Sequence, residues 1–273
     1  MKGIFIDFEG IDGSGKGSLI RLLIERLKNW GIDDLVMGKE PGGTPLGLKI
    51  RELLFKDPTT HEMADSVCDC LFLADHIQHV EKVIKPALAA GQVIISDRYA
   101  YSQFAYGQDR TVHPLIYQAY EELIGPVPDI IFLLGGTPEN LLERAQGRTE
   151  ETHQAGKTWN NADAQRKIQE FYLRMLIPMA QTVWVDTDVL TPEVLFERYL
   201  WPPVEKLLRP NIKALTGVKT GDAPAAPSPL LKQLMNGARD LPERRKTYTP
   251  DMAAALCRNE PAEIVMRRDG SVQ

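Results

Sequence analysis

The sequence predicts a doubly wound α/β fold, in which helices flank both faces of a five-stranded, mainly parallel sheet. Two observations predict it: five short apolar runs recur along the first two hundred residues, and helix-length amphipathic stretches separate them. Strands that alternate with helices are joined by right-handed crossovers, which makes the strands parallel and covers both faces. The predicted strands are residues 3–8, 34–37, 92–96, 129–134 and 182–186.

The first predicted strand leads into a glycine-rich loop, residues 10–18, and then into a helical run. The glycines let successive backbone N–H groups face one anion, the helix N-terminus adds partial positive charge, and Lys16 adds a full charge. This order predicts a P-loop that binds a nucleoside triphosphate, rather than a merely flexible turn. The predicted ATP-binding residues of the loop are Gly10, Ile11, Asp12, Gly13, Ser14, Gly15, Lys16, Gly17 and Ser18.

The loop departs from the usual P-loop pattern at one position. Gly17 follows the lysine, where a serine or threonine normally supplies a hydroxyl to magnesium. The nearest hydroxyl is one residue later, at Ser18. We therefore expect Ser18 to be the hydroxyl candidate for the metal, with direct ligation left open.

Composition limits the class of protein. The chain has 273 residues, of which 43% are hydrophobic and 25% charged, which predicts one main globular domain with an appendage. A net charge of −5 argues against nonspecific binding to nucleic acid. We expect neither a targeting leader nor a membrane-spanning segment, and the three cysteines fit neither a disulfide framework nor a metal site. We expect a cytoplasmic protein without a membrane or nucleic-acid partner.

The last quarter of the chain differs in composition from the rest. Residues 217–229 are rich in proline, glycine and alanine, which favours an extended linker. We expect a P-loop domain over residues 1–207, followed by a linker and a largely disordered tail over 208–273. The alternative is a tail that folds when it docks on a partner, and the sequence does not identify such a partner.

Four motifs stand in one order: FEGIDGSGK at 8–16, EPGGTPLG at 40–47, LFLADHIQHV at 71–80 and DRYAYSQFAY at 97–106. Together they closely resemble the thymidylate kinases over about residues 3–200. The resemblance implies transfer of the ATP γ-phosphoryl group, with magnesium, to dTMP or a related pyrimidine deoxynucleotide. It also implies a lid at about residues 144–166. Members of this family are commonly dimers, so it further suggests a homodimer, which no residue here demonstrates.

The chemistry of such a transfer points to cationic and metal-binding side chains. Two polyanions must meet while the charge of the migrating group is neutralised, so the site needs magnesium, a lysine and arginines more than a nucleophilic side chain. We predict Lys16, Asp97 and Arg98 as catalytic residues. Lys16 would hold the triphosphate, Asp97 the metal, and Arg98 would bridge donor and acceptor phosphates with its forked donors. The alternative for Asp97 and Arg98 is an ion pair at a strand end.

The resemblance also implies the residues that recognise the acceptor. Asp12 would meet the sugar 3′-OH, although a role in capping the loop is an alternative. Phe72 would stack on the pyrimidine, with ordinary core packing as its alternative. Tyr106 would lie under the ribose and leave no room for a 2′-OH, and Gln103 would face the base edge.

Two departures from the family pattern concern the acceptor side. Lys39 stands where an arginine usually grips the acceptor phosphate, which keeps the charge but not the bidentate fork. His76 stands where an arginine usually reads the base carbonyl. An imidazole is shorter and can donate or accept, so we hypothesise that His76 reads the base edge, in thymine or in a modified dUMP such as the 5-hydroxymethyl form. The alternative is a solvent-facing helix residue.

The lid is the least regular part of the resemblance. Arg144 and Arg148, four residues apart on a predicted helix, are the candidate lid arginines for the ATP phosphates, with solvated surface charge as the alternative. The family's usual Asp-Arg pair after this segment is missing. A protein of another class, a non-catalytic nucleotide-binding module whose tail recruits a partner, therefore stays open.

Overall fold

The computed structural model describes residues 3–107, 114–146, 161–211 and 215. Its centre is a five-stranded sheet in which all neighbouring strands are parallel, in the order β2-β3-β1-β4-β5. The strands are β1 (Ile4–Gly10), β2 (Leu35–Lys39), β3 (Val93–Asp97), β4 (Ile130–Gly135) and β5 (Thr182–Asp186). The predicted fold class and its five strands are confirmed, with ends that shift by at most two residues.

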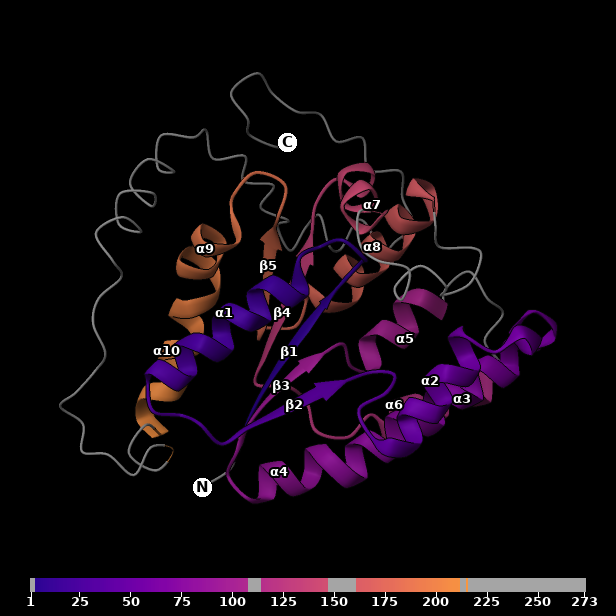
Figure 1. The fold of residues 1–273 in the computed structure, drawn as a ribbon, viewed down its shortest axis with the longest axis horizontal. Helices are drawn as coiled ribbons and strands as arrows, with labels where there is room; N and C mark the ends of the chain where they lie inside the picture. Colours follow the sequence, from indigo (N-terminus) through magenta and orange to yellow (C-terminus); the bar gives the residue numbers. More distant parts are fainter. Residues whose placement is uncertain (1–2, 108–113, 147–160, 212–214, 216–273) are drawn as a thin grey trace.

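Helices fill every interval between the strands (Figure 1). The α-helices are α1 (Lys16–Asn29), α2 (Pro45–Phe55), α3 (Asp65–His79), α4 (Lys85–Ala89), α5 (Ala100–Gly107), α6 (Pro114–Leu123), α7 (Pro138–Gln146), α8 (Ala162–Leu176), α9 (Pro192–Leu195) and α10 (Trp201–Leu208). Two π-helical turns, η2 (Val80–Ile84) and η4 (Phe196–Leu200), join α3 to α4 and α9 to α10. Two short 3₁₀ segments are η1 (Pro58–Glu62) and η5 (Arg209–Asn211).

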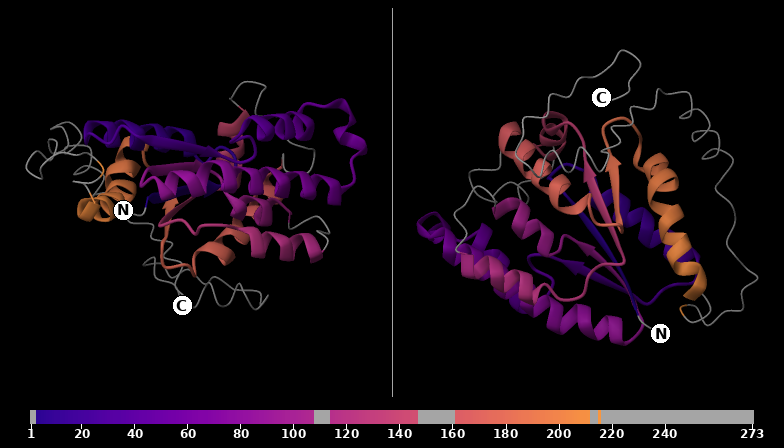
Figure 2. Two further views of the ribbon diagram at one scale, coloured as in Figure 1. Left: turned by 90° about the horizontal axis from the view of Figure 1, so that it is seen from below. Right: turned by 180° about the vertical axis from the view of Figure 1, so that it is seen from behind.

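The sheet separates two hydrophobic cores, one on each face. Helices α1, α9 and α10 cover one face, while α3 to α6 and α8 cover the other (Figures 1 and 2). Alternation along β1 explains the division, because Ile6 packs on the α1 side and Phe5 on the opposite side, where its ring lies 5.1 Å from that of Tyr99. Burial on both faces requires the nearly continuous apolar strands that the sequence shows.

The topology brings two loops to one edge of the sheet. Strand β1 lies between β3 and β4, and the chain leaves β1 into α1 through residues 11–15. Phe8 of β1 is in register with Asp97 at the end of β3, so the glycine loop and Arg98 both follow the carboxyl ends of adjacent strands. In open α/β sheets this edge is where ligands bind.

The lid and the tail are only partly within the described residues. Residues 147–160 of the predicted lid, and the tail apart from 208–211 and 215, lie outside them. The proposed boundary between domain and tail near residue 207 therefore stays a prediction. Among the described residues, no helix combines the length and the apolar character needed to cross a bilayer.

Candidate functional site

A cavity of about 260 Å³ opens at the carboxyl ends of β1, β2 and β3. Its walls combine the glycine loop, the end of β2, and side chains from helices α2, α3, α5 and α6. The lining residues are Asp12, Gly13, Ser14, Gly15, Lys16, Gly17, Lys39, Glu40, Pro41, Arg51, Phe55, Phe72, Asp75, Asp97, Arg98, Tyr99, Ser102, Gln103, Tyr106 and Tyr120. One end is polar and cationic, and the other carries aromatic rings.

The glycine loop has the geometry of an anion cradle. Gly13 and Gly15 adopt left-handed φ angles of 77° and 84°, and Gly15 is the N-cap of α1. A side chain at Gly13 would place its Cβ 1.8 Å from the carbonyl oxygen of Leu141, so only glycine fits. The loop therefore brings the N-terminus of α1, with its partial positive charge, to the cavity.

Lys16 belongs to both the loop and the first turn of α1. Its ammonium donates to the carbonyl oxygens of Gly10 at 2.9 Å and Ile11 at 3.1 Å. Burial, followed by the nearby charge of Arg98, lowers the pKa of Lys16 to about 8. Gly10 and Ile11 thus serve through their carbonyl groups beneath the loop and do not line the cavity. An anion in the cavity would favour the charged ammonium.

Arg98 lines the same cavity as Lys16. It adopts a φ of 76°, the one non-glycine residue with positive φ in the described part of the chain. One end of its guanidinium donates to Asp12 at 2.6 Å and to the hydroxyl of Tyr106 at 3.0 Å. The other end donates to Ser102 at 3.2 Å and to Tyr172 at 3.3 Å. A strained backbone whose side chain is held by four hydrogen bonds is typical of a functional residue with a fixed orientation.

Glu9 is linked to Arg98 through shared hydrogen-bond partners, and the sequence analysis did not identify it as a site residue. Its carboxylate accepts from Ser102 at 2.7 Å, from Tyr172 at 2.8 Å and from the backbone N–H of Tyr99 at 2.9 Å. Burial raises the pKa of Glu9, partly offset by Arg98 and these donors. Because Ser102 and Tyr172 bond both Glu9 and Arg98, they link a buried acid to the guanidinium. Tyr172 lies 163 residues from Glu9, so no local motif could reveal this link.

Asp97 is the residue best suited to hold a cation. It ends β3 and lines the cavity, and its buried Oδ1 has no hydrogen-bond partner among the described residues. A buried carboxylate oxygen without a donor fits a hard divalent cation or its waters. Ser18, the second predicted metal residue, lies in α1 beyond the last loop residue of the cavity wall. Within the described residues, no three His, Cys, Asp or Glu side chains gather as a metal site.

The aromatic end of the cavity gathers the predicted acceptor residues from three helices. Phe72 on α3 lies edge-on to Phe55 on α2, with ring centroids 6.1 Å apart, and both line the cavity with Tyr106 and Gln103 of α5. Tyr106 is also bonded to Arg98, so α5 connects the aromatic end with the cationic end. The structure thus brings Phe72, Gln103 and Tyr106 together as the sequence predicts. Lys39 joins the same wall at the end of β2.

Arg51 also lines the cavity, and the sequence analysis missed it. It lies on α2, donates to the carbonyl oxygen of Pro41 at 3.1 Å, and packs over the ring of Phe55 at 5.1 Å. Lys39 cannot hold a phosphate with two parallel N–H groups, and the Arg51 guanidinium in the same cavity wall supplies that bidentate donor. A lone arginine on an amphipathic helix resembles any surface charge, so only its position after the residue 40–47 motif could have drawn attention to it.

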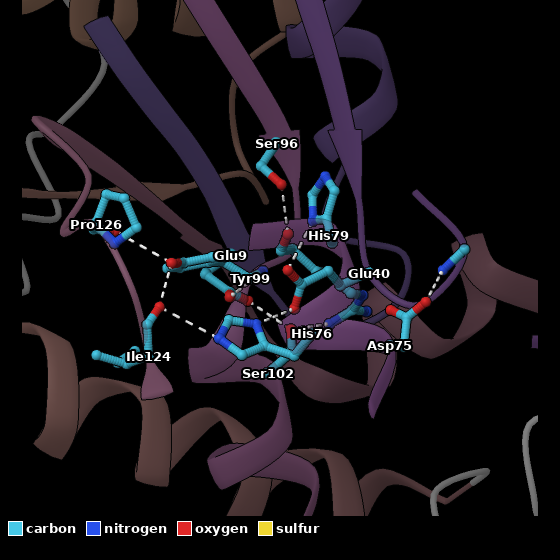
Figure 3. Close-up of polar contacts among 12 residues, drawn as sticks. Glu9, Glu40, Asp75, His76, His79, Ser96, Tyr99, Ser102, Ile124 and Pro126 are labelled. Carbon is cyan, nitrogen blue, oxygen red and sulfur yellow. Dashed lines mark hydrogen bonds and ion pairs between the residues drawn. The ribbon is translucent and has the colours of Figure 1, made fainter. Parts of the chain in front are cut away.

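His76 lies elsewhere than predicted. It is 1% exposed and is not part of the cavity wall. Its Nδ1 lies 2.9 Å from Glu40 Oε2, and its Nε2 lies 3.2 Å from the carbonyl oxygen of Ile124 (Figure 3). Both ring nitrogens face acceptors, so the doubly protonated imidazolium satisfies both contacts. The structure gives this histidine a buried partner in place of the base edge, because Glu40 attracts the side chain inward.

Glu40 is held between two histidines. His79 Nδ1 lies 2.8 Å from Oε1, opposite the contact from His76 (Figure 3). Although burial opposes it, the charge of His76 and the bonds from both rings lower the pKa of Glu40. Burial likewise opposes the charge of His76, but Glu40 raises the pKa of the imidazole. This arrangement fixes the backbone between Lys39 and Pro41, which forms a wall of the cavity.

Of the two predicted lid arginines, Arg144 lies within the described residues. Arg144, at the end of α7, donates to the carbonyl oxygen of Thr187 at 3.0 Å and lies 3.5 Å from the carboxylate of Asp188. It therefore contacts the loop after β5 and does not line the cavity. Arg148 lies outside the described residues.

Comparison with known proteins identifies the family. The family profile described as Thymidylate kinase matches residues 8–193. The chain belongs to the thymidylate kinase family. It is 36% identical over 202 residues to the thymidylate kinase of Halothermothrix orenii, covering 73% of this chain and 96% of that protein. It is 43% identical over 149 residues to that of Ruegeria pomeroyi, covering 54% and 69%, and 36% identical over 208 residues to that of Ectopseudomonas mendocina, covering 71% and 98%.

Proposed function

We propose that this chain is an enzyme that transfers the γ-phosphoryl group of ATP to dTMP, giving dTDP and ADP. Membership of the thymidylate kinase family supports the reaction. The observation that carries it in the structure is one cavity lined by Lys16, Arg98 and several aromatic rings. That arrangement suits two phosphate groups meeting between cations, with a flat base held by Phe72.

The reaction needs no side-chain nucleophile. An oxygen of the acceptor phosphate forms a new bond to the γ-phosphorus, while the bond from that phosphorus to the β,γ-bridging oxygen breaks and ADP leaves. Lys16 and the N–H groups at the start of α1 hold the triphosphate. Arg98 holds the two phosphates in line, and Glu9 with Tyr172 keeps its guanidinium fixed through the contacts described above.

Magnesium fits the polar end of the cavity. Asp97, with its unpartnered buried oxygen, is the residue that would hold the ion or its waters. Bound there, magnesium would neutralise charge on the triphosphate oxygens. Ser18 is a weaker candidate because it lies outside the cavity wall.

The acceptor binds at the opposite end. Lys39 and Arg51 are the cations for its phosphate, which replaces the single arginine expected from the family pattern. Tyr106 restricts the space beside the sugar, and Asp12, which accepts from Arg98 at 2.6 Å, would meet the sugar hydroxyl. We also propose that Arg144, Arg148 and a lid over residues 144–166 take part in ATP binding. A homodimer, a tail that follows the kinase domain and a cytoplasmic location are further proposals.

The test is a measurement of ADP release by the purified full chain with ATP, magnesium and each of dTMP, dUMP, dCMP and 5-hydroxymethyl-dUMP. We expect dTMP to be turned over best. Lys16→Ala should lower kcat by roughly 10³ or more, because a cation aimed at the transferring group is lost. Lys28→Ala, an exposed lysine on the same helix α1, is the matched control and should leave kcat unchanged.

The same panel decides between the alternatives from the sequence. The modified-dUMP alternative drew on His76 and Lys39. Lys39 lines the cavity and His76 does not, so this alternative is favoured only if 5-hydroxymethyl-dUMP is turned over better than dTMP. ATP binding without ADP release from any of the four acceptors would overturn the enzyme assignment. That outcome would favour a nucleotide-binding module.

A further inference from the structure

Gln103 places a carboxamide among aromatic side chains. It lies on α5 and lines the cavity together with Phe55, Phe72 and Tyr106. Aromatic rings contact the face of a flat base, whereas the edge of the base needs polar partners in a fixed order. A primary amide offers one acceptor and one donor side by side, which is the pattern needed to read such an edge. Gln103 is therefore placed to read the edge of a base that lies against Phe72.

A buried carboxylate fixes which way this amide points. Gln103 Nε2 donates to Asp69 Oδ1 at 2.9 Å, across 34 residues of sequence and between α5 and α3. Asp69 is fully buried, one turn of α3 before Phe72. Oδ1 of Asp69 accepts this hydrogen bond, so it holds the amide nitrogen of Gln103 on its own side. Because the amide is planar, its oxygen then lies on the other side.

We propose that Asp69 is a positioning residue that sets base specificity through Gln103. With the amide held in this orientation, its oxygen accepts a hydrogen bond from N3–H of the base, and its second N–H donates one to O4. Thymine and uracil present that pair of groups. Cytosine presents the reverse pair, an acceptor at N3 and a donor at the 4-amino group, and would require the amide to flip. This proposal rests on the proposed function, since it places a pyrimidine 5′-monophosphate in the cavity.

Flipping the amide is unfavourable because its oxygen would then face the Asp69 carboxylate. Two acceptors would lie together in a buried site, and both would lose a donor. Sites that hydrogen-bond a substrate edge reject the mismatched analogue for this reason. His76 offers no competing contact to the base, since both of its nitrogens are bonded to Glu40 and Ile124. His76 therefore does not compete with Gln103 for the edge of the base.

Asp69→Asn tests the proposal with almost no change in size. An asparagine can turn either its oxygen or its nitrogen toward Gln103, so the amide of Gln103 becomes free to flip. We expect the ratio of kcat/KM for dTMP to that for dCMP to fall by roughly tenfold or more, chiefly through a lower KM for dCMP. The kcat for dTMP should stay within a few-fold, because the contact that is changed lies between Asp69 and Gln103 and not at the glycine loop. Asp65→Asn, an exposed aspartate in the first turn of the same helix, should leave the ratio unchanged.

A second variant shows whether Asp69 acts through Gln103. Gln103→Met removes the reading group and should itself lower the ratio, and adding Asp69→Asn to it should change the ratio no further. An unchanged ratio in Asp69→Asn, or an equal change in the Gln103→Met background, would overturn the proposal. If the Asp69→Asn variant fails to fold, Gln103→Met alone tests the proposal. A ratio of kcat/KM for dTMP to that for dCMP that Gln103→Met leaves unchanged would overturn it as well.

The two proposals fail in different ways. Calorimetric binding of dTMP and dCMP to the full chain, without ATP, measures base preference independently of phosphoryl transfer. Wild-type protein that prefers dTMP in binding, and loses that preference in Asp69→Asn, supports the role of Asp69 even if no ADP is released. Wild-type turnover of dTMP with a preference that Asp69→Asn leaves intact supports the kinase and excludes this role.

Discussion

The two ends of the cavity are built in different ways. The phosphate end consists of one continuous stretch, residues 10–17, whose backbone forms the cradle, with Arg98 beside it. The base end consists of side chains from α2, α3, α5 and α6, oriented by contacts between residues far apart in sequence, such as Asp69 with Gln103 and Glu40 with His76. A backbone cradle needs specific glycines, whereas an assembled wall depends on buried polar partners. The first end is thus sensitive to added atoms, and the second to changed charge.

Among the variants that test this contrast between the two ends, the largest expected effect comes from adding one methyl group to the cradle. Gly13→Ala puts a Cβ against the Leu141 carbonyl at a φ of 77°, so the loop must move. A displacement of about 1 Å at the triphosphate should lower kcat/KM by roughly 10² or more. Gly17→Ala adds the same atom in the same loop, but its Cβ meets no protein atom within 4 Å and the backbone there is helical, so its loss should be smaller. Equal losses in the two variants, measured with dTMP and ATP, would show that the cradle geometry is not what matters.

The next effect tests the junction between the two ends. Arg98→Lys keeps the charge but replaces a fork that bonds Asp12, Tyr106, Ser102 and Tyr172 with a single ammonium. We expect kcat for dTMP to fall by roughly 10- to 100-fold, while the KM values for ATP and dTMP change much less. A loss confined to the KM for dTMP would instead place Arg98 at the acceptor alone.

The sequence predicted the phosphate end well because its information is local. Strand, glycine loop and helix are consecutive, and their spacing alone determines where Lys16 and the helix N-terminus lie. The base end was predicted only as far as matching motif residues allowed. Phe72 and Gln103 reach the cavity, but the same spacing placed His76 there incorrectly, since the sequence does not show that Glu40 lies within 2.9 Å of it. Glu9, Arg51 and Asp69 were missed because their partners come from distant segments or carry no local signal.

The buried ion pair at the base end should make stability depend on pH. The pKa of His76 is raised by Glu40, so its folded form keeps a proton that the unfolded chain releases near pH 6.5. Its stabilisation is complete below that pH and is lost as the pH rises through the folded pKa. His76→Gln cannot ionise, so we expect it to lower stability by about 1.5–3 kcal/mol at pH 6 and to show a flatter fall of Tm above pH 6.5.

Denaturant titrations and thermal melts of both proteins between pH 6 and 9 measure this difference. Parallel curves for wild type and His76→Gln would contradict a charged imidazole beside Glu40. The kcat for dTMP should stay within a few-fold, because His76 does not line the cavity and acts on it only through neighbours such as Glu40, Tyr99 and Tyr120.

The smallest expected effect is on stability and comes from Asp7, a buried residue of β1. Neither carboxyl oxygen of this fully buried side chain has a hydrogen-bond partner among the described residues. Burial first, then the charges of Glu9, Glu40 and Asp97, raises its pKa well above the ordinary value. The folded protein thus keeps a proton that the unfolded chain releases near pH 4, so stability falls as the pH rises above that value.

Asp7→Asn removes this titration while preserving the shape of the side chain. We expect it to raise the free energy of unfolding by about 1 kcal/mol at pH 7 to 8 and to have almost no effect near pH 4. The exposed Asp33→Asn is the control and should leave the profile unchanged. A stabilisation that is the same at both pH values would mean that packing, and not the proton, is responsible. Carboxylates from both ends of the cavity raise the pKa of Asp7. An increase in the free energy of unfolding that depends on pH would therefore show that the two ends, although built differently, are coupled electrostatically through Asp7.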